Sequence, residues 1–328
     1  DVYKRQPSRL ASRSDKVLGS DRWAAPAAAP AITCTSRRAS TALLRTPSCI
    51  SDPCGALAPR ALMSPAMATL TVIGGGKMGE ALVGGLLENG WDPEDIEVVE
   101  PVEARREELA KAHEGLAVAD AATAVTDVLI AVKPNHCQTV CEAIAPLAPT
   151  RVLSIAAGVT TASLESWLPS GTSVVRAMPN TPALVGAGMA AISGGAAAQA
   201  DDLGWASDIL ATVGEVITVN EQTLDAVTGL SGSGPAYVFL LAEALTAAGV
   251  GVGLEPETAD TLTRQTLLGA ARLLAESGED PAQLRANVTS PGGTTAAGLA
   301  VFEEAGFEDL VQRVVTAATE RSKELGAE

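Results

Sequence analysis

The chain has 328 residues, more than one hydrophobic core usually supports, so we expect two domains. Hydrophobic residues make up 47% and aromatic residues only 3%, a composition that disfavours an aromatic-rich β-sandwich. Residues 1–66 carry 10 Lys/Arg and 4 Asp/Glu, whereas the remaining residues carry 13 Lys/Arg and 35 Asp/Glu. This acidic body argues against nucleic acid as the main partner.

The first 66 residues show no apolar period and are rich in Ala, Ser, Pro and Arg. We expect this segment to lie outside the fold. Two explanations stay open: an upstream extension before a true start at Met67, which we favour, or an Arg/Ser-rich organelle transit peptide. We expect a cytoplasmic protein, or an organellar one if the transit peptide is genuine.

Two cysteines, Cys137 and Cys141, fall in the body of the chain, and the other three lie in the first segment. Such a distribution does not predict a disulfide framework. The i,i+4 spacing could place both sulfurs on one side of a helix, but His136 is the only other metal ligand close by in sequence. We therefore expect buried thiols and no metal site.

From Met67 the pattern becomes regular: residues 68–90, ATLTVIGGGKMGEALVGGLLENG, indicate an apolar strand, a glycine turn and an amphipathic helix. Gly74, Gly76 and Gly79 stand in G-x-G-x-x-G register directly after the strand. The first would allow the tight turn, the second the approach of a pyrophosphate, and the third close packing of helix on strand. An ordinary strand-to-helix turn is the alternative, and this context favours dinucleotide binding.

The alternation continues with a strand at 96–100, a helix at 103–112, a strand at 125–134, a helix at 136–147 and a strand at 151–159. Alternating strands and helices predict a parallel, doubly wound sheet. Glu100 ends the second strand, where an acid would bind ribose hydroxyls and disfavour a 2′-phosphate. Arg105 and Arg106 follow soon after, so NADH and NADPH both stay open, as does a merely solvated helix start.

The ends of the next two strands fall at the carboxyl edge of the sheet, where ligands of such folds lie. Val132, Lys133 and Pro134 follow one strand, although Lys133 could simply point into solvent. Ala156 and Ala157 follow the other and are small enough to admit a nicotinamide ring, with close packing as the alternative. A strand, a rigid MPNTP turn and another strand are predicted over 176–192.

Strand signals stop after 214–219. Residues 224–254 predict a Gly/Ser turn followed by a long helix, with further helices at 257–278, at 280–288 and after 294. The run 236–254 holds one charge, yet it is dense in Ala and Gly and lacks basic flanks. It indicates a buried interface helix rather than a membrane span. An Ala/Leu-rich helical half suggests a bundle that a second subunit could complete.

The stretch NVTSPGGTTAAGL, 287–299, places Gly292 and Gly293 just before a helix that should begin near Thr294. Exposed backbone N–H groups and the helix dipole at such a point suit a carboxylate-sized anion, and Thr294 and Thr295 add hydroxyls. No strong acid or base lies in this stretch, so a cofactor should perform the chemistry. A plain capping loop is the alternative.

Five motifs, IGGGKMGEAL, AVKP, MPNTP, TGLSGSGPAY and NVTSPGGTTAAGL, together resemble the pyrroline-5-carboxylate reductase family over residues 67–328. The resemblance implies a Rossmann-type dinucleotide-binding domain at 67–220 and an all-α substrate-binding and dimerisation domain at 221–328. It implies the reduction of 1-pyrroline-5-carboxylate to L-proline by NADPH or NADH, the last step of proline biosynthesis. It also implies a homodimer or a higher oligomer, with a decamer as one option, and neither a membrane nor a nucleic-acid partner.

The resemblance also assigns residues. Thr295 would be catalytic, through a hydrogen bond to the ring nitrogen. The substrate would be held by Ser290, Gly292, Gly293, Thr294, Thr295 and Glu276, although a difference in length makes another glutamate an alternative to Glu276. The cofactor would contact Ile73, Gly74, Gly75, Gly76, Lys77, Met78, Val132, Lys133, Ala156, Ala157 and Asn287. Glu100 and Pro134 join the predicted cofactor contacts because of their positions at strand ends and not through the resemblance.

One departure from the resemblance concerns Glu100, because many relatives place small polar residues there and Asp120 adds a second negative charge. The family's usual cofactor preference is therefore not carried over. A related reductase, either a hydroxyacid dehydrogenase or a different cyclic-imine reductase, is a competing interpretation. Hydroxyacid dehydrogenases commonly use a lysine in the helical half, and no lysine lies between Lys133 and Lys323. A catalytically silent nucleotide-binding scaffold is the second alternative.

Overall fold

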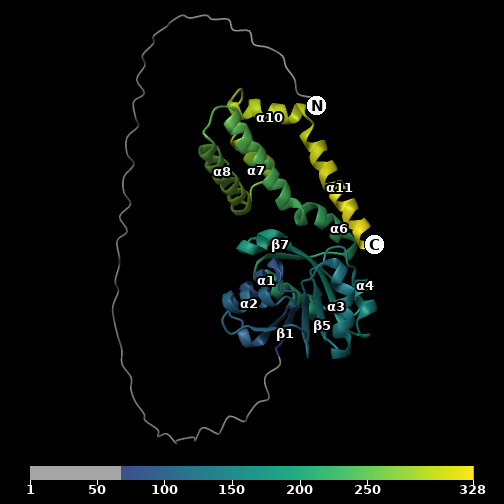
Figure 1. Ribbon diagram of the computed structural model, residues 1–328. Helices are drawn as coiled ribbons and strands as arrows, with labels where there is room; N and C mark the ends of the chain where they lie inside the picture. Colours follow the sequence, from purple (N-terminus) through teal and green to yellow (C-terminus); the bar gives the residue numbers. More distant parts are fainter. Residues whose placement is uncertain (1–67, 328) are drawn as a thin grey trace, which may run out of the picture. The chain divides into compact units, whose positions relative to one another are not determined.

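The computed structural model describes residues 68–327, and the predicted extension 1–66 and start at Met67 lie outside them. Eight strands form one sheet in the order β3-β2-β1-β4-β5-β6-β7-β8 (Figure 1). Neighbouring strands are parallel except for the antiparallel pair β6 and β7. The strands are β1 (Leu70–Ile73), β2 (Ile96–Val99), β3 (Ala117–Ala119), β4 (Asp127–Ile130), β5 (Arg151–Ser154), β6 (Ser173–Met178), β7 (Gly188–Gly194) and β8 (Gly214–Thr218).

Helices cover both faces of this sheet. Leu82 of α1, Leu109 of α2 and Ile209 of α5 belong to one buried cluster, whereas Ile144 of α3 and Leu164 of α4 belong to the other. Because side chains alternate along a strand, a strand buried on both faces must be apolar at every position, as β1 and β4 nearly are. These helices are α1 (Lys77–Glu88), α2 (Glu103–Ala112), α3 (Cys137–Ile144), α4 (Thr161–Trp167) and α5 (Ala200–Ala211).

The described chain after β8 consists of helices joined by short loops and has no strand. One short 3₁₀ segment, 221–223, begins this half, and the others, at 93–95, 134–136, 145–147 and 181–185, lie among the strands and helices before it. The helices of this half are α6 (Leu224–Val227), a π-helical turn at Thr228–Gly232, α7 (Gly234–Gly251), α8 (Pro256–Ser277), α9 (Pro281–Asn287), α10 (Thr294–Glu304) and α11 (Phe307–Ala327). The predicted doubly wound sheet followed by a helical half is confirmed.

Several predicted elements differ in detail. The predicted Gly/Ser turn before the long helix is wrong, because Thr228–Gly232 continues the helix as a π-turn. An added Cβ at Gly229 would lie 2.3 Å from the Thr319 hydroxyl of α11, so this glycine allows two helices to approach closely. The strands predicted at 125–134 and 151–159 are shorter, ending at Ile130 and Ser154.

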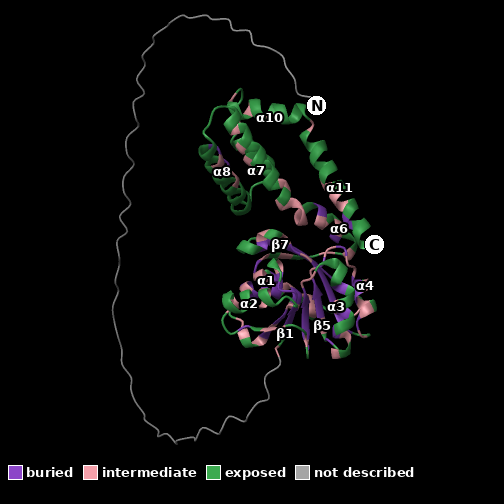
Figure 2. Ribbon diagram, in the orientation of Figure 1, coloured by how far each residue is buried: buried purple, intermediate pink, exposed green. Residues whose placement is uncertain are grey.

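The helical half has few buried side chains in the single chain (Figure 2). No residue of α7 or α10 is buried, and in α8 only Ala259 and Thr263 are. By length and composition, one stretch of the described residues, Glu221–Gly251, could cross a membrane, and none of its apolar window is buried within this chain. Large apolar side chains such as Phe239 and Leu240 are more than half exposed.

Candidate active site

The glycine loop between β1 and α1 has the geometry that its spacing predicts. Gly74 has a φ of +108°, and an added Cβ there would lie 2.6 Å from the carbonyl oxygen of Ala131. An added Cβ at Gly79 would lie 2.2 Å from the carbonyl oxygen of Gly74. Gly76, by contrast, has no atom within 4 Å of the same position. The loop is therefore packed at its first and third glycines and open at its second, where a pyrophosphate would approach.

The first turn of α1 offers free backbone donors. Gly76 is the N-cap residue and provides no side-chain cap. Within residues 68–327, the amides of Lys77 and Met78 have no hydrogen-bond acceptor, as follows from their place at the helix start. Unpaired amides and the positive end of the helix dipole suit a phosphate group. The residues at this turn therefore fit the pyrophosphate of a dinucleotide.

Glu100 lies against this loop. The amide of Gly75 donates to its Oε2 and the amide of Val102 to its Oε1, each at 3.0 Å. Arg105 donates from Nε to the carbonyl oxygen of Gly75 at 2.7 Å. Hydrogen bonds to Glu108 and Glu80 raise the pKa of Arg105 above its ordinary value. The acid and the first arginine are thus both fixed to the cofactor loop.

Two further strand ends meet the same edge of the sheet. Val132 and Lys133 directly follow β4, with Val132 half-buried and Lys133 exposed. Ala156, which is buried, and Ala157, which is half-buried, follow β5. Because the carboxyl ends of parallel strands share an edge, the structure brings these residues to the side of the sheet that bears the glycine loop. Pro134 begins a 3₁₀ turn just beyond.

The SPGGTT loop forms a second helix N-terminus without a side-chain cap. Gly292 has a φ of +69°, and Gly293 is the N-cap residue of α10. The amide of Gly293 donates to the carbonyl oxygen of Ser290 at 3.0 Å. The amides of Thr294 and Thr295 have no acceptor among the described residues. The predicted helix start at Thr294 is confirmed, and its geometry suits a small anion.

The other two predicted residues of the helical half are tied to local partners or exposed. Asn287 accepts a hydrogen bond from Gln283 and donates one to Glu279. Glu276 lies exposed in the last turn of α8. Within residues 68–327, no hydrogen bond or ion pair joins these residues or the SPGGTT loop to the glycine loop. The roles of all these residues stay predictions.

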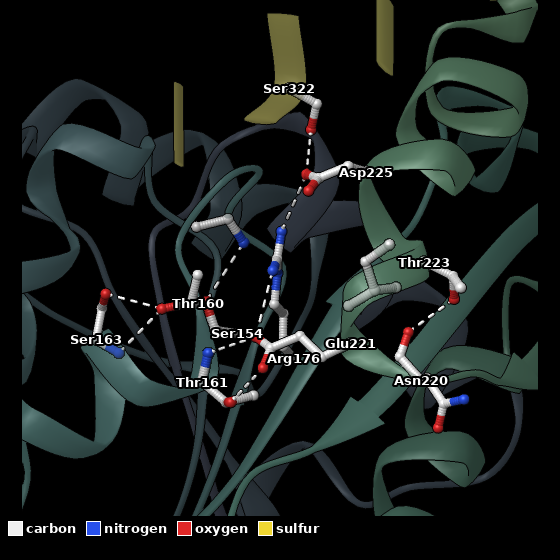
Figure 3. A network of polar contacts seen from close by, with 12 residues as sticks. Ser154, Thr160, Thr161, Ser163, Arg176, Asn220, Glu221, Thr223, Asp225 and Ser322 are labelled. Carbon is white, nitrogen blue, oxygen red and sulfur yellow. Dashed lines mark hydrogen bonds and ion pairs between the residues drawn. The ribbon is translucent and has the colours of Figure 1, made fainter. Parts of the chain in front are cut away.

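A buried ionic network that the sequence did not reveal joins β6 to the start of the helical half (Figure 3). Arg176, whose side chain is 6% exposed, donates to Oε1 of Glu221 at 3.3 Å and lies 3.9 Å from Oδ1 of Asp225. Thr161 donates to Glu221 from its amide and its hydroxyl, each at 2.7 Å. Ser322 of α11 donates to Asp225 at 2.7 Å. The network therefore anchors α6 and α11 to the sheet.

The electrostatics of Glu221 follow from this network. Burial alone would raise the pKa of its carboxyl, but the hydrogen bonds from Thr161 and Arg176 and the charge of Arg176 outweigh burial and lower the pKa below its ordinary value. The sequence did contain one signal: Arg176 is the single charged residue in the otherwise buried strand β6. A buried arginine requires an acidic partner, although the strand alone does not indicate which one.

The two cysteines are buried, as predicted. Cys137 and Cys141 are fully buried on α3 and are both free thiols. Burial raises the pKa of Cys137 to about 11, and burial together with the neighbouring thiol and Glu142 raises that of Cys141 to about 12. They therefore serve as core side chains.

The doubly wound sheet and the glycine loop define a dinucleotide-binding protein of the Rossmann type. A family model described as pyrroline-5-carboxylate reductase dimerisation matches residues 221–325, and one described as coenzyme F420-dependent NADP oxidoreductase matches residues 69–158. Pyrroline-5-carboxylate reductase of Synechocystis sp. is 46% identical over 78% of this chain and 98% of its own.

Two solved structures of pyrroline-5-carboxylate reductases are also similar to this chain. The pyrroline-5-carboxylate reductase of Coxiella burnetii is 39% identical with a TM-score of 0.75, over 79% of this chain and 99% of that one. The pyrroline carboxylate reductase of Plasmodium falciparum with NADP bound is 32% identical with a TM-score of 0.70, over 79% and 98%. The chain belongs to the pyrroline-5-carboxylate reductase family. The predicted family, fold class and NAD(P)H-dependent oxidoreductase class are confirmed.

Proposed function

We propose that this protein reduces 1-pyrroline-5-carboxylate to L-proline with NADPH or NADH, as the final step of proline biosynthesis in the cytoplasm. The observation that carries the proposal is the pair of uncapped helix N-termini, one at Gly76 in the dinucleotide loop and one at Gly293 in the helical half. The first suits a pyrophosphate and the second a carboxylate. The identity of the substrate is inferred from membership of the pyrroline-5-carboxylate reductase family.

The cofactor would lie along the carboxyl edge of the sheet. When bound, it supplies the hydride that reduces the carbon of the C=N bond. The open position at Gly76 and the free amides of Lys77 and Met78 would hold its pyrophosphate, and Glu100 would face its adenosine ribose. The residues that would complete this surface are Ile73, Gly74, Gly75, Val132, Lys133, Pro134, Ala156, Ala157 and Asn287.

The substrate carboxylate would bind at the SPGGTT loop. The free amides of Thr294 and Thr295 would donate to it, together with the hydroxyl of Ser290. The ring nitrogen would already carry its proton when the hydride arrives, so the step needs no strong acid from the protein, and the hydroxyl oxygen of Thr295 would accept a hydrogen bond from this N–H. Glu276, on the last turn of α8, is the proposed additional contact.

A second copy of the chain would complete the helical half. The exposed apolar side chains of α7 and α8 include Phe239, Leu241 and Leu262, and none of the α7 residues is buried in the single chain. Large apolar side chains exposed on neighbouring helices are typical of a protein interface. We propose a homodimer, which could assemble further into a decamer, in place of insertion of Glu221–Gly251 into a membrane.

The test of this function is the initial rate of NADPH and NADH oxidation by the full chain with 1-pyrroline-5-carboxylate. A five-membered cyclic imine without the carboxylate is the control substrate. Turnover confined to the carboxylate substrate would support both the reaction and the anion site. An absence of turnover with either cofactor, despite cofactor binding, would overturn the proposed reaction and favour a silent scaffold.

The role of Thr295 has its own test. Thr295→Ala should lower kcat/KM for the imine by about 10- to 100-fold, with little change in cofactor affinity, because it removes a hydrogen bond to the reacting ring. Thr258→Ala, an exposed threonine of α8, is the matched control. Equal loss of cofactor affinity and of kcat/KM would contradict the assigned role.

A further inference from the structure

The carboxylate of Glu100, at the end of β2, is held in one orientation by backbone amides. Both of its carboxylate oxygens are fixed, one by the amide of Gly75 in the glycine loop and the other by the amide of Val102. Each oxygen has a second lone pair, so the carboxylate can still accept two hydroxyl donors. The side chain is thus already oriented beside the loop that would hold the pyrophosphate, where the adenosine ribose of a dinucleotide lies.

Of the two arginines that could balance a 2′-phosphate, Arg105 is largely engaged elsewhere. Arg105 uses Nε for the carbonyl oxygen of Gly75, one terminal nitrogen for Glu80 at 2.5 Å and the other for Glu108 at 2.8 Å. Its charge is therefore neutralised by two carboxylates. Three of its five N–H donors are thus in use, and the two acids keep its charge from balancing a phosphate in full.

Arg106 is less restricted. One of its terminal nitrogens donates to the carbonyl oxygens of Glu100 and Pro101, each at 2.9 Å. Its other nitrogens have no acceptor among the described residues, so it keeps some capacity for a phosphate. We therefore expect discrimination against a 2′-phosphate and not complete exclusion.

A second acid strengthens the negative field at this edge. The amide of Glu100 donates to the carbonyl oxygen of Ala119, the last residue of β3, and Asp120 follows directly and is exposed. Two acidic residues thus follow neighbouring parallel strands. A 2′-phosphate, which carries close to two negative charges near neutral pH, would meet like charge there, whereas a 2′-hydroxyl would find an acceptor.

We infer that Glu100 makes this enzyme prefer NADH over NADPH, with the carboxylate accepting the ribose 2′-hydroxyl. The inference rests on the proposed function only in that the cofactor binds at the glycine loop. It does not depend on the identity of the imine. A preference of at least about 10-fold in dissociation constant is expected, which corresponds to a difference of about 1.4 kcal/mol.

The experiment measures dissociation constants of NADH and NADPH by nucleotide fluorescence, with the full chain and without imine, and then kcat/KM for each cofactor with 1-pyrroline-5-carboxylate. The variants are Glu100→Gln, which removes the charge and keeps the shape, and Glu100→Asp, which keeps the charge. Glu103→Gln is the matched control, because Glu103 is an exposed carboxylate three residues further on.

The wild type and Glu100→Asp should prefer NADH, Glu100→Gln should lose at least about 10-fold of that preference, and Glu103→Gln should keep it. Equal binding of both cofactors by the wild type, or tighter binding of NADPH, would overturn the inference whether or not the variants fold. So would an unchanged ratio in Glu100→Gln, or an equal change in Glu103→Gln. Preferential NADH binding without imine reduction would refute the proposed function and leave this inference standing.

Discussion

Arg176 provides the most direct test of how the helical half is attached to the sheet. Its side chain is 6% exposed, and its partners Glu221 and Asp225 are 29% and 21% exposed. Removing one partner of a buried ion pair costs about 3–5 kcal/mol, because the remaining charge stays desolvated. Since both carboxylates keep some contact with water and hydrogen bonds from Thr161 and Ser322, we expect Arg176→Met to cost about 3 kcal/mol, the lower end of that range.

The assay is urea unfolding followed by circular dichroism at a fixed protomer concentration. Arg176→Lys is the control, because it keeps the charge and loses the planar donor group, and it should cost less than Arg176→Met. Adding Glu221→Gln and Asp225→Asn to Arg176→Met should recover more than about 1 kcal/mol of unfolding free energy, since the two unpaired carboxylate charges are removed. A loss below about 1 kcal/mol in Arg176→Met, or no recovery in the triple variant, would refute the reasoning.

Three further outcomes are expected. Gly79→Ala should weaken NADH binding by at least about 10-fold, because its Cβ would lie 2.2 Å from the carbonyl oxygen of Gly74. Gly84→Ala in the same helix is the control: its Cβ would lie 3.7 Å from the nearest atom, in His113, and the dissociation constant should not change. Cys137 and Cys141 should stay unlabelled by iodoacetamide at about pH 8 in native protein and be labelled after unfolding, as peptide mass spectrometry would show, because their raised pKa values keep both thiols protonated. Because the pKa of Glu221 is lowered in the folded state, its carboxylate stabilises the fold at pH values above the ordinary pKa of 4.5, and this stability is lost as pH falls through the folded-state pKa. The unfolding free energy of Glu221→Gln should therefore depend less steeply on pH below about 4.5 than that of the wild type. Parallel pH profiles would contradict this.

The sheet was predictable where strands are buried on both faces. β1, β2 and β4 are short apolar runs followed by turn or helix signals, and their order in the chain specifies parallel pairing. β3 was missed because three residues at the edge of the sheet carry too little pattern. α5 was missed because its apolar residues are mixed with Ala, Gly and acidic residues, so its helical period is weak in the sequence.

The Gly/Ser stretch before α7 shows why local composition can mislead. TGLSG has the residues of a turn, yet it forms a π-helical turn packed against α11, and Gly229 lies against Thr319 and the carbonyl of Val315. That contact joins residues far apart in the chain and leaves no periodic signal. The Arg176 network was hidden for the same reason, since Glu221 is 45 residues away in a 3₁₀ segment.

The two helix N-termini of the site differ in how they are supported. The glycine loop is fixed by contacts inside one chain, from Ala131, Glu100 and Arg105, so its geometry is complete in the single chain. The SPGGTT loop begins an exposed helix, and within residues 68–327 it makes no bond to the glycine loop. An anion site of this kind is weak in water, because exposed amides exchange one acceptor for another at little gain. The SPGGTT loop should therefore bind an anion tightly only when another surface excludes solvent from it. That surface would be the bound cofactor, the proposed second subunit, or both.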